Sequence, residues 1–285
     1  MRSRPPFFIP DSTFSISSGS TAAPEVIDRG KGSPVVLIPG IQGRWEWMKP
    51  TVDALARRCR VITFSLSGDP GSGMKADPGA GTDGFVAQID RVLDRAGLER
   101  AALCGVSLGG LVALRYAAER PARVSALVLV STPGPGWRPN AVQAFCVRHP
   151  WLAPPVFVAG AFVRLTPEVV RARGGWIAAA RFAVMQLARV VAHPPSTRRM
   201  RQRYSTWLAD VGREDCGRVR TPTLVLTGDR RLDRVVPADG SLEYVRCIAN
   251  ARAATVEDSG HIGLITRPDR FAEIVTGFVN DSVGC

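Results

Sequence analysis

The sequence predicts an α/β fold in which helices cover both faces of a mostly parallel, doubly wound sheet. Short apolar runs rich in branched residues alternate along the chain with segments of helical periodicity. This is the pattern of parallel strands that are buried on both faces. A long stretch in the middle of the chain breaks the alternation, because it contains only helical patterns. We therefore expect an α/β core that carries an inserted helical segment.

Five apolar runs are expected to form buried strands, since none shows the polar alternation of a strand with one wet face. They cover residues 35–38, 61–64, 101–106, 126–130 and 223–227, and a further short strand is expected at 253–256. The main helical patterns of the core cover residues 83–96, 108–118 and 270–279. Strands that alternate with helices in this way predict right-handed crossover connections.

The strandless segment sets the expected domain boundaries. The first part of the core covers residues 1–135, a helical cap covers 136–218, and the second part of the core covers 219–285. Within the cap, Thr166 and Pro167 are expected to begin a helix as its N-cap and first helical residue. A long apolar helix is expected over residues 176–193.

Ser196 is expected to be the N-cap residue of one more helix in this segment. Helical spacing there predicts one apolar face, formed by Met200, Tyr204, Trp207, Leu208 and Val211.

Positive charge is concentrated in the cap. The chain has a formal net charge of +12, and residues 137–220 contain 14 arginines but only four acidic residues. Such charge usually faces water. The alternative is that the cap attracts anionic substrates or makes peripheral contact with an anionic lipid surface. No helix-turn-helix or aromatic–basic pattern indicates nucleic-acid binding.

The cysteines and the apolar stretches argue against several classes of protein. The six cysteines are scattered, and neither they nor the three histidines have zinc-ligand spacing. Arginines interrupt the longest apolar stretches, so no membrane-spanning helix is expected, and residues 1–10 do not read as a secretory signal. We expect free thiols, a cytoplasmic location and no metal or organic cofactor. The sequence leaves the oligomeric state open.

A glycine-flanked serine follows the third apolar run. Residues 105–110 read Gly-Val-Ser-Leu-Gly-Gly, with a strand pattern before them and a helix pattern after them. A sharp strand-to-helix turn needs small neighbours, and it would project the hydroxyl of Ser107 at a helix N-terminus. An incidental serine in a glycine-rich turn is the alternative, but the flanking elements favour a nucleophile.

A serine nucleophile needs a base, and the base needs an orienting acid. Of the three histidines, His261 lies in a short polar loop before the last helix, whereas His149 and His193 each precede a proline in the helical insertion. The acid is expected after the fifth run, where Asp229 and Asp233 are both candidates. We select Asp233 for its spacing to the Val-Val-Pro sequence and keep Asp229 as the alternative.

The tetrahedral intermediate of acyl transfer needs two donors for its oxyanion. One is expected to be the backbone N–H of Leu108, directly after the serine. The other is expected in the loop after the first core strand, at the backbone N–H of Ile41.

Together these features resemble the α/β-hydrolase superfamily, in particular its lid-bearing esterases and related enzymes. The resemblance runs from about residue 35 to the end of the chain and rests on residues 39–43 with the tryptophans after them, 105–110, 120–124, 233–237 and 260–261. It implies an α/β-hydrolase fold, the roles of nucleophile, acid and histidine for Ser107, Asp233 and His261, and a cap over the active site. The serine argues against haloalkane dehalogenases and epoxide hydrolases, whose relatives use aspartate there.

The leading function is therefore hydrolysis of a small carboxylic ester, lactones and thioesters included, through an acyl-serine intermediate. Carbon–carbon bond hydrolysis and acyl transfer use the same triad, and a non-catalytic binding protein on this fold is the alternative outside enzymes. An apolar substrate pocket is expected to include Trp45, Trp176 and Phe182, and the apolar inner faces of the cap are expected to include Trp151, Val156, Phe157 and Phe162 as well. Ordinary lid core is the other interpretation of these aromatic residues.

Overall fold

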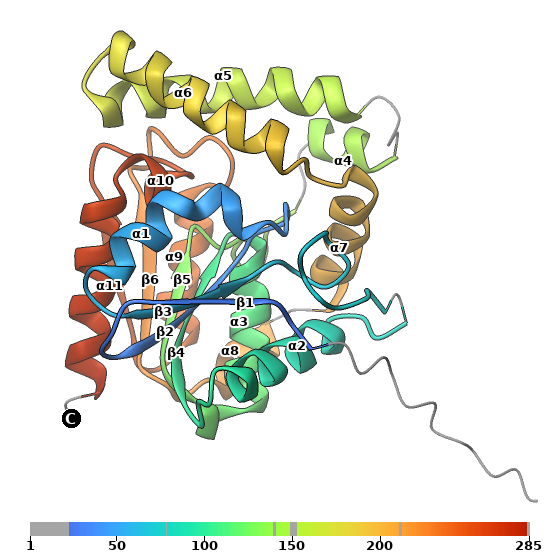
Figure 1. The fold of residues 1–285 in the computed structure, drawn as a ribbon, viewed down its shortest axis with the longest axis vertical. Helices are drawn as coiled ribbons and strands as arrows, with labels where there is room; N and C mark the ends of the chain where they lie inside the picture. Colours follow the sequence, from blue (N-terminus) through green and yellow to red (C-terminus); the bar gives the residue numbers. More distant parts are fainter. Residues whose placement is uncertain (1–22, 78, 139–140, 149–152, 211–212, 284–285) are drawn as a thin grey trace, which may run out of the picture.

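The computed structural model describes residues 23–77, 79–138, 141–148, 153–210 and 213–283. They form a seven-stranded sheet in the order β1-β3-β2-β4-β5-β6-β7 (Figure 1). The edge strand β1 pairs with β3 in antiparallel fashion, and all other neighbours are parallel. The strands are β1 (Val26–Arg29), β2 (Pro34–Ile38), β3 (Arg60–Phe64), β4 (Ala101–Val106), β5 (Val124–Val130), β6 (Thr223–Gly228) and β7 (Ala251–Val256).

The predicted α/β fold is confirmed, and each predicted strand is present within a few residues of its expected bounds. Strand β1 is not among the predicted strands. Its four residues, Val-Ile-Asp-Arg, contain no apolar run, and its two last residues are exposed. An edge strand of this kind lacks the burial that marks the central strands.

Helices cover the two faces of the sheet, as Figure 1 shows. On one face, Val35 and Leu37 of β2 belong to a core cluster with residues of α1 (Lys49–Ala56) and α11 (Pro268–Val283). On the other, Val36 and Ile38 pack in a cluster with α2, α3 and α9. These helices are α2 (Asp83–Arg95), α3 (Leu108–Glu119) and α9 (Ala238–Cys247), and shorter turns are η1 (Trp45–Met48), η2 (Pro121–Arg123) and α10 (Gly263–Thr266).

Between β5 and β6 the described residues form helices and no strand, as the sequence predicts. These helices are α4 (Ala141–Arg148), α5 (Ala153–Arg173), α6 (Trp176–Ala192), α7 (Thr197–Asp210) and α8 (Arg213–Arg218). In Figure 1, α5 and α6 cross above one end of the core, whereas α7 runs down its side. The division into core and cap domains stays a prediction.

The predicted helix start at Thr166 is wrong. Helix α5 is continuous and contains Pro167 in its interior. A proline inside a helix lacks the N–H that would bond to the carbonyl four residues earlier. Beside it, the hydroxyl of Thr166 donates to the carbonyl of Phe162 at 2.6 Å, so it bonds back along the helix rather than capping it.

The predicted cap at Ser196 is confirmed, since its Oγ accepts from the N–H of Arg199 at 3.4 Å. Helix α7 buries Met200 and Trp207, and the ring of Trp207 meets Phe85 of α2 edge-on at 5.0 Å. The side chains of Leu208 and Val211, also predicted on this face, lie outside the described residues. Helix α7 therefore contributes directly to the core.

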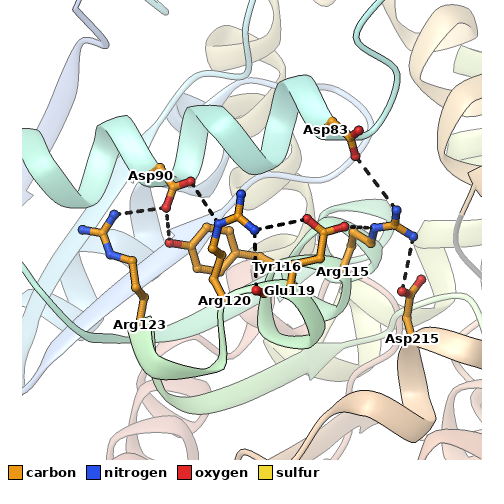
Figure 2. A network of polar contacts seen from close by, with 8 residues as sticks. All are labelled: Asp83, Asp90, Arg115, Tyr116, Glu119, Arg120, Arg123 and Asp215. Carbon is orange, nitrogen blue, oxygen red and sulfur yellow. Dashed lines mark hydrogen bonds and ion pairs between the residues drawn. The ribbon is translucent and has the colours of Figure 1, made fainter.

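A polar network fastens α8 to the core (Figure 2). Arg115 of α3 donates to the buried Asp215 of α8 at 3.3 Å and also pairs with Glu119. Farther along, Asp90 of α2 accepts from the hydroxyl of Tyr116 at 2.7 Å and from Arg123 at 3.0 Å.

Among the described residues, no helix has both the length and the apolar character needed to cross a membrane.

Candidate active site

Ser107 occupies the sharp turn between β4 and α3. Its backbone has φ 52° and ψ −124°, which is a strained conformation for a residue other than glycine. A Cβ at Gly105 would lie 2.6 Å from the carbonyl of Gly109, so only glycine fits where the strand passes the helix. The backbone N–H of Ser107 donates to the carbonyl of Val130 at 2.7 Å, which ties the turn to β5.

The loop after β2 lies directly against this turn. A Cβ added at Gly40 would lie 3.5 Å from the Cβ of Ser107, and one at Gly109 would collide with the carbonyl of Pro39. The loop closes on itself through the N–H of Gly43, which donates to Gly40 at 3.0 Å. The structure thus brings the loop of Ile41 beside the N-terminus of α3, which begins at Leu108.

Asp233 and His261 meet at the ends of β6 and β7. The Nδ1 atom of His261 lies 3.4 Å from Oδ2 of Asp233. The other carboxylate oxygen accepts two backbone N–H groups, from Val235 and Val236, each at 3.0 Å. The alternative acid, Asp229, instead accepts the N–H of Arg231 at 2.9 Å and has no bond to the imidazole. Of the two candidates, the structure therefore pairs Asp233 with His261.

Burial and mutual charge set the protonation of this pair. Burial alone would raise the pKa of Asp233, but the imidazole and the two backbone donors lower it below its ordinary value. Burial alone would lower the pKa of His261, but Asp233 and then Glu168 raise it above its ordinary value. The arrangement favours an ionised acid beside an imidazole that holds a proton readily.

Ser107 and His261 lie at the same edge of the sheet. In the parallel register Val106 aligns with Val130, and Val130 with Leu226, so the loops after these strands meet. Val130 and His261 line one small cavity, and Ser107 bonds to the carbonyl of Val130. The hydroxyl of Ser107 makes no hydrogen bond to any residue that the structure describes.

Glu168 is a site residue that the sequence analysis missed. It lies on α5, is fully buried, and accepts the backbone N–H of Ile262 at 3.0 Å. Burial raises its pKa to about 7, although the backbone donors of Gly260 and Ile262 and the nearby His261 oppose this rise. In the sequence it resembles an ordinary acid in the first turn of a helix, and no local signal marks it as buried.

A second missed residue is Arg203 on α7. It is 3% exposed, pairs with the buried Asp69, and donates to the carbonyl of Ile41 at 3.1 Å. An arginine in a strongly basic helix reads as a solvated residue, because only the fold reveals the buried carboxylate that faces it. Arg203 therefore helps to hold the loop that lies against the serine turn.

The three predicted substrate contacts are placed differently. Phe182 is 7% exposed and belongs to the core cluster that contains Val35 and Leu37. The guanidinium carbon of Arg173 lies 5.2 Å from the centre of its ring. Trp45 is partly buried and packs against the same cluster. Trp176 is 71% exposed, so this placement gives no support to a substrate contact. Phe162 of the predicted apolar lid face is also mostly exposed. The side chains of Trp151, Val156 and Phe157 lie outside the described residues.

Comparison with known proteins bears on the family and the fold. Residues 33–153 match the family model described as alpha/beta hydrolase fold. The chain is 32% identical over 257 residues to RutD of Azorhizobium caulinodans, a proposed carbamate hydrolase, covering 88% of this chain and 93% of that protein.

Two solved structures share the fold. The enol-lactonase of Burkholderia xenovorans LB400 superimposes with a TM-score of 0.75 at 21% identity, over 90% of this chain and 95% of that one. An esterase of Exiguobacterium antarcticum gives 0.73 at 22% identity, over 90% and 94%. At these identities the two structures support only the fold assignment. From the motif, the sheet and the relative of matching length, the chain belongs to the alpha/beta-hydrolase family.

Proposed function

We propose that this protein is a serine hydrolase that cleaves a small carboxylic ester, a lactone or thioester included, through an acyl-serine intermediate. The observation that carries the proposal is the pair of the buried Asp233 and the partly buried His261 at the sheet edge where Ser107 occupies a strained turn. Strain and perturbed protonation concentrated at one edge are typical of catalytic sites.

The reaction follows from the positions of these groups. The Oγ of Ser107 attacks the substrate carbonyl while His261 takes its proton, and Asp233 stabilises the imidazolium that forms. The N–H groups of Ile41 and Leu108 are assigned to the oxyanion of the tetrahedral intermediate. His261 then protonates the departing alkoxide, and a water molecule repeats the sequence to release the acid and restore the serine. Phe182 and Trp45 are assigned to the wall of the acyl pocket.

A carbamate is the second candidate substrate. The RutD relative, 32% identical, is named for that activity, and the attack of serine on a carbamate carbonyl uses the same groups. Measuring kcat/KM with 4-nitrophenyl acetate and with 4-nitrophenyl carbamate distinguishes the two candidate substrate classes, because these two compounds have the same leaving group. We expect the larger kcat/KM for the ester, and the reverse order would favour the carbamate. Formation of a new ester with an added alcohol would identify acyl transfer.

The main test compares Ser107→Ala with the wild type on nitrophenyl esters of increasing acyl length. We expect a loss of roughly 10⁴-fold or more in kcat, because triad members act as a unit. Ser65→Ala is the matched control, since Ser65, like Ser107, directly follows a strand, and its buried hydroxyl has no partner among the described residues. A fluorophosphonate probe should label the wild type and the control only. Substantial turnover by folded Ser107→Ala would overturn the proposal.

The cytoplasmic location and the contact of the basic cap with anionic lipid stay predictions.

A further inference from the structure

A second cavity lies away from the triad. It has a volume of about 180 Å³ and is enclosed by the loop after β3, by α2 and by α7. This is far above the roughly 10–15 Å³ that one water needs on the same measure, so the space accepts a small organic molecule. None of Ser107, Asp233 and His261 lines it.

Three cationic side chains line this cavity besides Arg203. Lys75 of the loop, Arg91 of α2 and Arg199 of α7 all line it. Their side chains make no hydrogen bond or ion pair with any residue that the structure describes, whereas Arg115 and Arg123 nearby are each paired with carboxylates. The one acidic residue in the lining is Asp77, whose Oδ1 accepts the N–H of Gly79 at 2.9 Å. The cavity therefore has an excess of positive charge that the described protein does not neutralise.

The floor of the cavity is polar and buried. Arg203 lines the cavity and forms an ion pair with Asp69, so its positive charge is already neutralised. Ser67 is 8% exposed, and its Oγ is buried without a hydrogen-bond partner among the described residues. An unsatisfied buried hydroxyl is uncommon and calls for an explanation. A ligand oxygen would provide the missing partner.

The remaining wall is apolar, with Met74 and Phe85 among its residues. We propose that this cavity binds a small organic anion, whose phosphate or carboxylate group is held by Lys75, Arg199, Arg91 and Ser67 and whose apolar part packs against Met74 and Phe85. Charge-assisted hydrogen bonds from Lys and Arg are the strongest that a protein offers to such oxygens. Because Arg203 also holds the carbonyl of Ile41, the site adjoins the loop beside the serine turn.

The test is titration calorimetry of the full chain at low ionic strength with phenyl phosphate, benzoate and benzyl alcohol. These probes share an aromatic ring and differ in charge. We expect saturable binding of at least one of the two anions and none of the neutral alcohol. The stronger anion identifies which oxyanion the site prefers.

The double variant Lys75→Gln/Arg199→Gln should weaken anion binding by about tenfold or more, as expected for the loss of two charge-assisted bonds. Arg198→Gln is the matched control, because Arg198 is exposed on the same helix and does not line the cavity. It should leave the affinity within about twofold. Circular dichroism checks that each variant is folded. Absence of saturable binding by both anions, or equal weakening in the control, would overturn the proposal.

Discussion

Two parts of the same helical insertion meet the core in different ways. Helix α7 buries Trp207 completely and pairs its Arg203 with Asp69, and α8 is fastened by Asp215 to Arg115 (Figure 2). Helices α5 and α6 instead leave many large apolar side chains in solvent. Those at least two-fifths exposed on these helices are Phe162, Val163, Trp176, Ile177, Val184, Met185, Leu187 and Val191.

Several of the contacts that join α5 and α6 to the core are polar. Glu168 accepts the N–H of Ile262, the amide of Gln186 donates to the carbonyl of Trp47, and the indole of Trp47 donates to the carbonyl of His193. The more apolar helices, α5 and α6, are thus the ones that leave more of their apolar side chains in solvent. Regions with few buried apolar contacts open most readily, so we expect α7 to unfold with the core and α5 and α6 to move more freely.

The largest expected effect contrasts two tryptophans. Trp207→Ala should lower the free energy of unfolding by about 3–5 kcal/mol, because it empties a fully buried site against Phe85. Trp176→Ala, on the exposed end of α6, should change it by no more than about 0.5 kcal/mol. Urea unfolding followed by circular dichroism measures both. Equal losses in the two variants would contradict the difference between the two parts.

The next effect tests the link between α5 and the loop of His261. Glu168 has a folded-state pKa of about 7, above its ordinary value. Its contribution to stability is therefore fully present below the ordinary pKa and is lost as pH rises through about 7. The side chain of Glu168→Gln carries no charge, so this variant should not lose stability as the pH rises. We expect its free energy of unfolding to be spared a loss on the order of 3 kcal/mol that the wild type shows above pH 7. Urea unfolding of both proteins across this pH range measures the difference.

The same substitution should also move the activity profile. Glu168 raises the pKa of His261, and a general base must be neutral to act, so the acid limb of kcat/KM should shift to lower pH in Glu168→Gln. Asp258→Asn is the matched control, because Asp258 joins α5 to the same region through an exposed pair with Arg171 at 2.7 Å. Its profile should stay in place. An unmoved profile in Glu168→Gln would show that this carboxyl does not act on the imidazole.

The smallest effect concerns the outer face of α6. Ile177→Ser and Val184→Ser should each change the free energy of unfolding by no more than about 0.5 kcal/mol, since both side chains are more than two-thirds exposed. Urea unfolding checks this as well. A loss of 2 kcal/mol or more, on the scale of about 2–5 kcal/mol for emptying a core site, would mean that this face is covered in solution.

Much of the fold was open to prediction because its signals are local. The buried strands appear as unbroken apolar runs, and the serine turn appears as glycines at fixed distances from Ser107, which the close approach of Gly105 to Gly109 explains. Helix α5 was predicted wrongly at Thr166, because a favourable N-cap sequence is only a weak preference and tertiary packing overrode it. The edge strand β1 was not predicted, because its last two residues are exposed and its sequence contains no apolar run.

By itself, the sequence determined the alternation of strands and helices, the strained serine turn, and the order of serine, acid and histidine along the chain. These follow from periodicity and spacing, which neighbouring residues carry. Only the tertiary structure decided that Asp233 rather than Asp229 meets His261, that Glu168 is buried beside the histidine loop, and that Arg203 faces Asp69. Each of these depends on segments dozens of residues apart coming together, and burial of a charge is set by that encounter rather than by the residue's own neighbours in the chain.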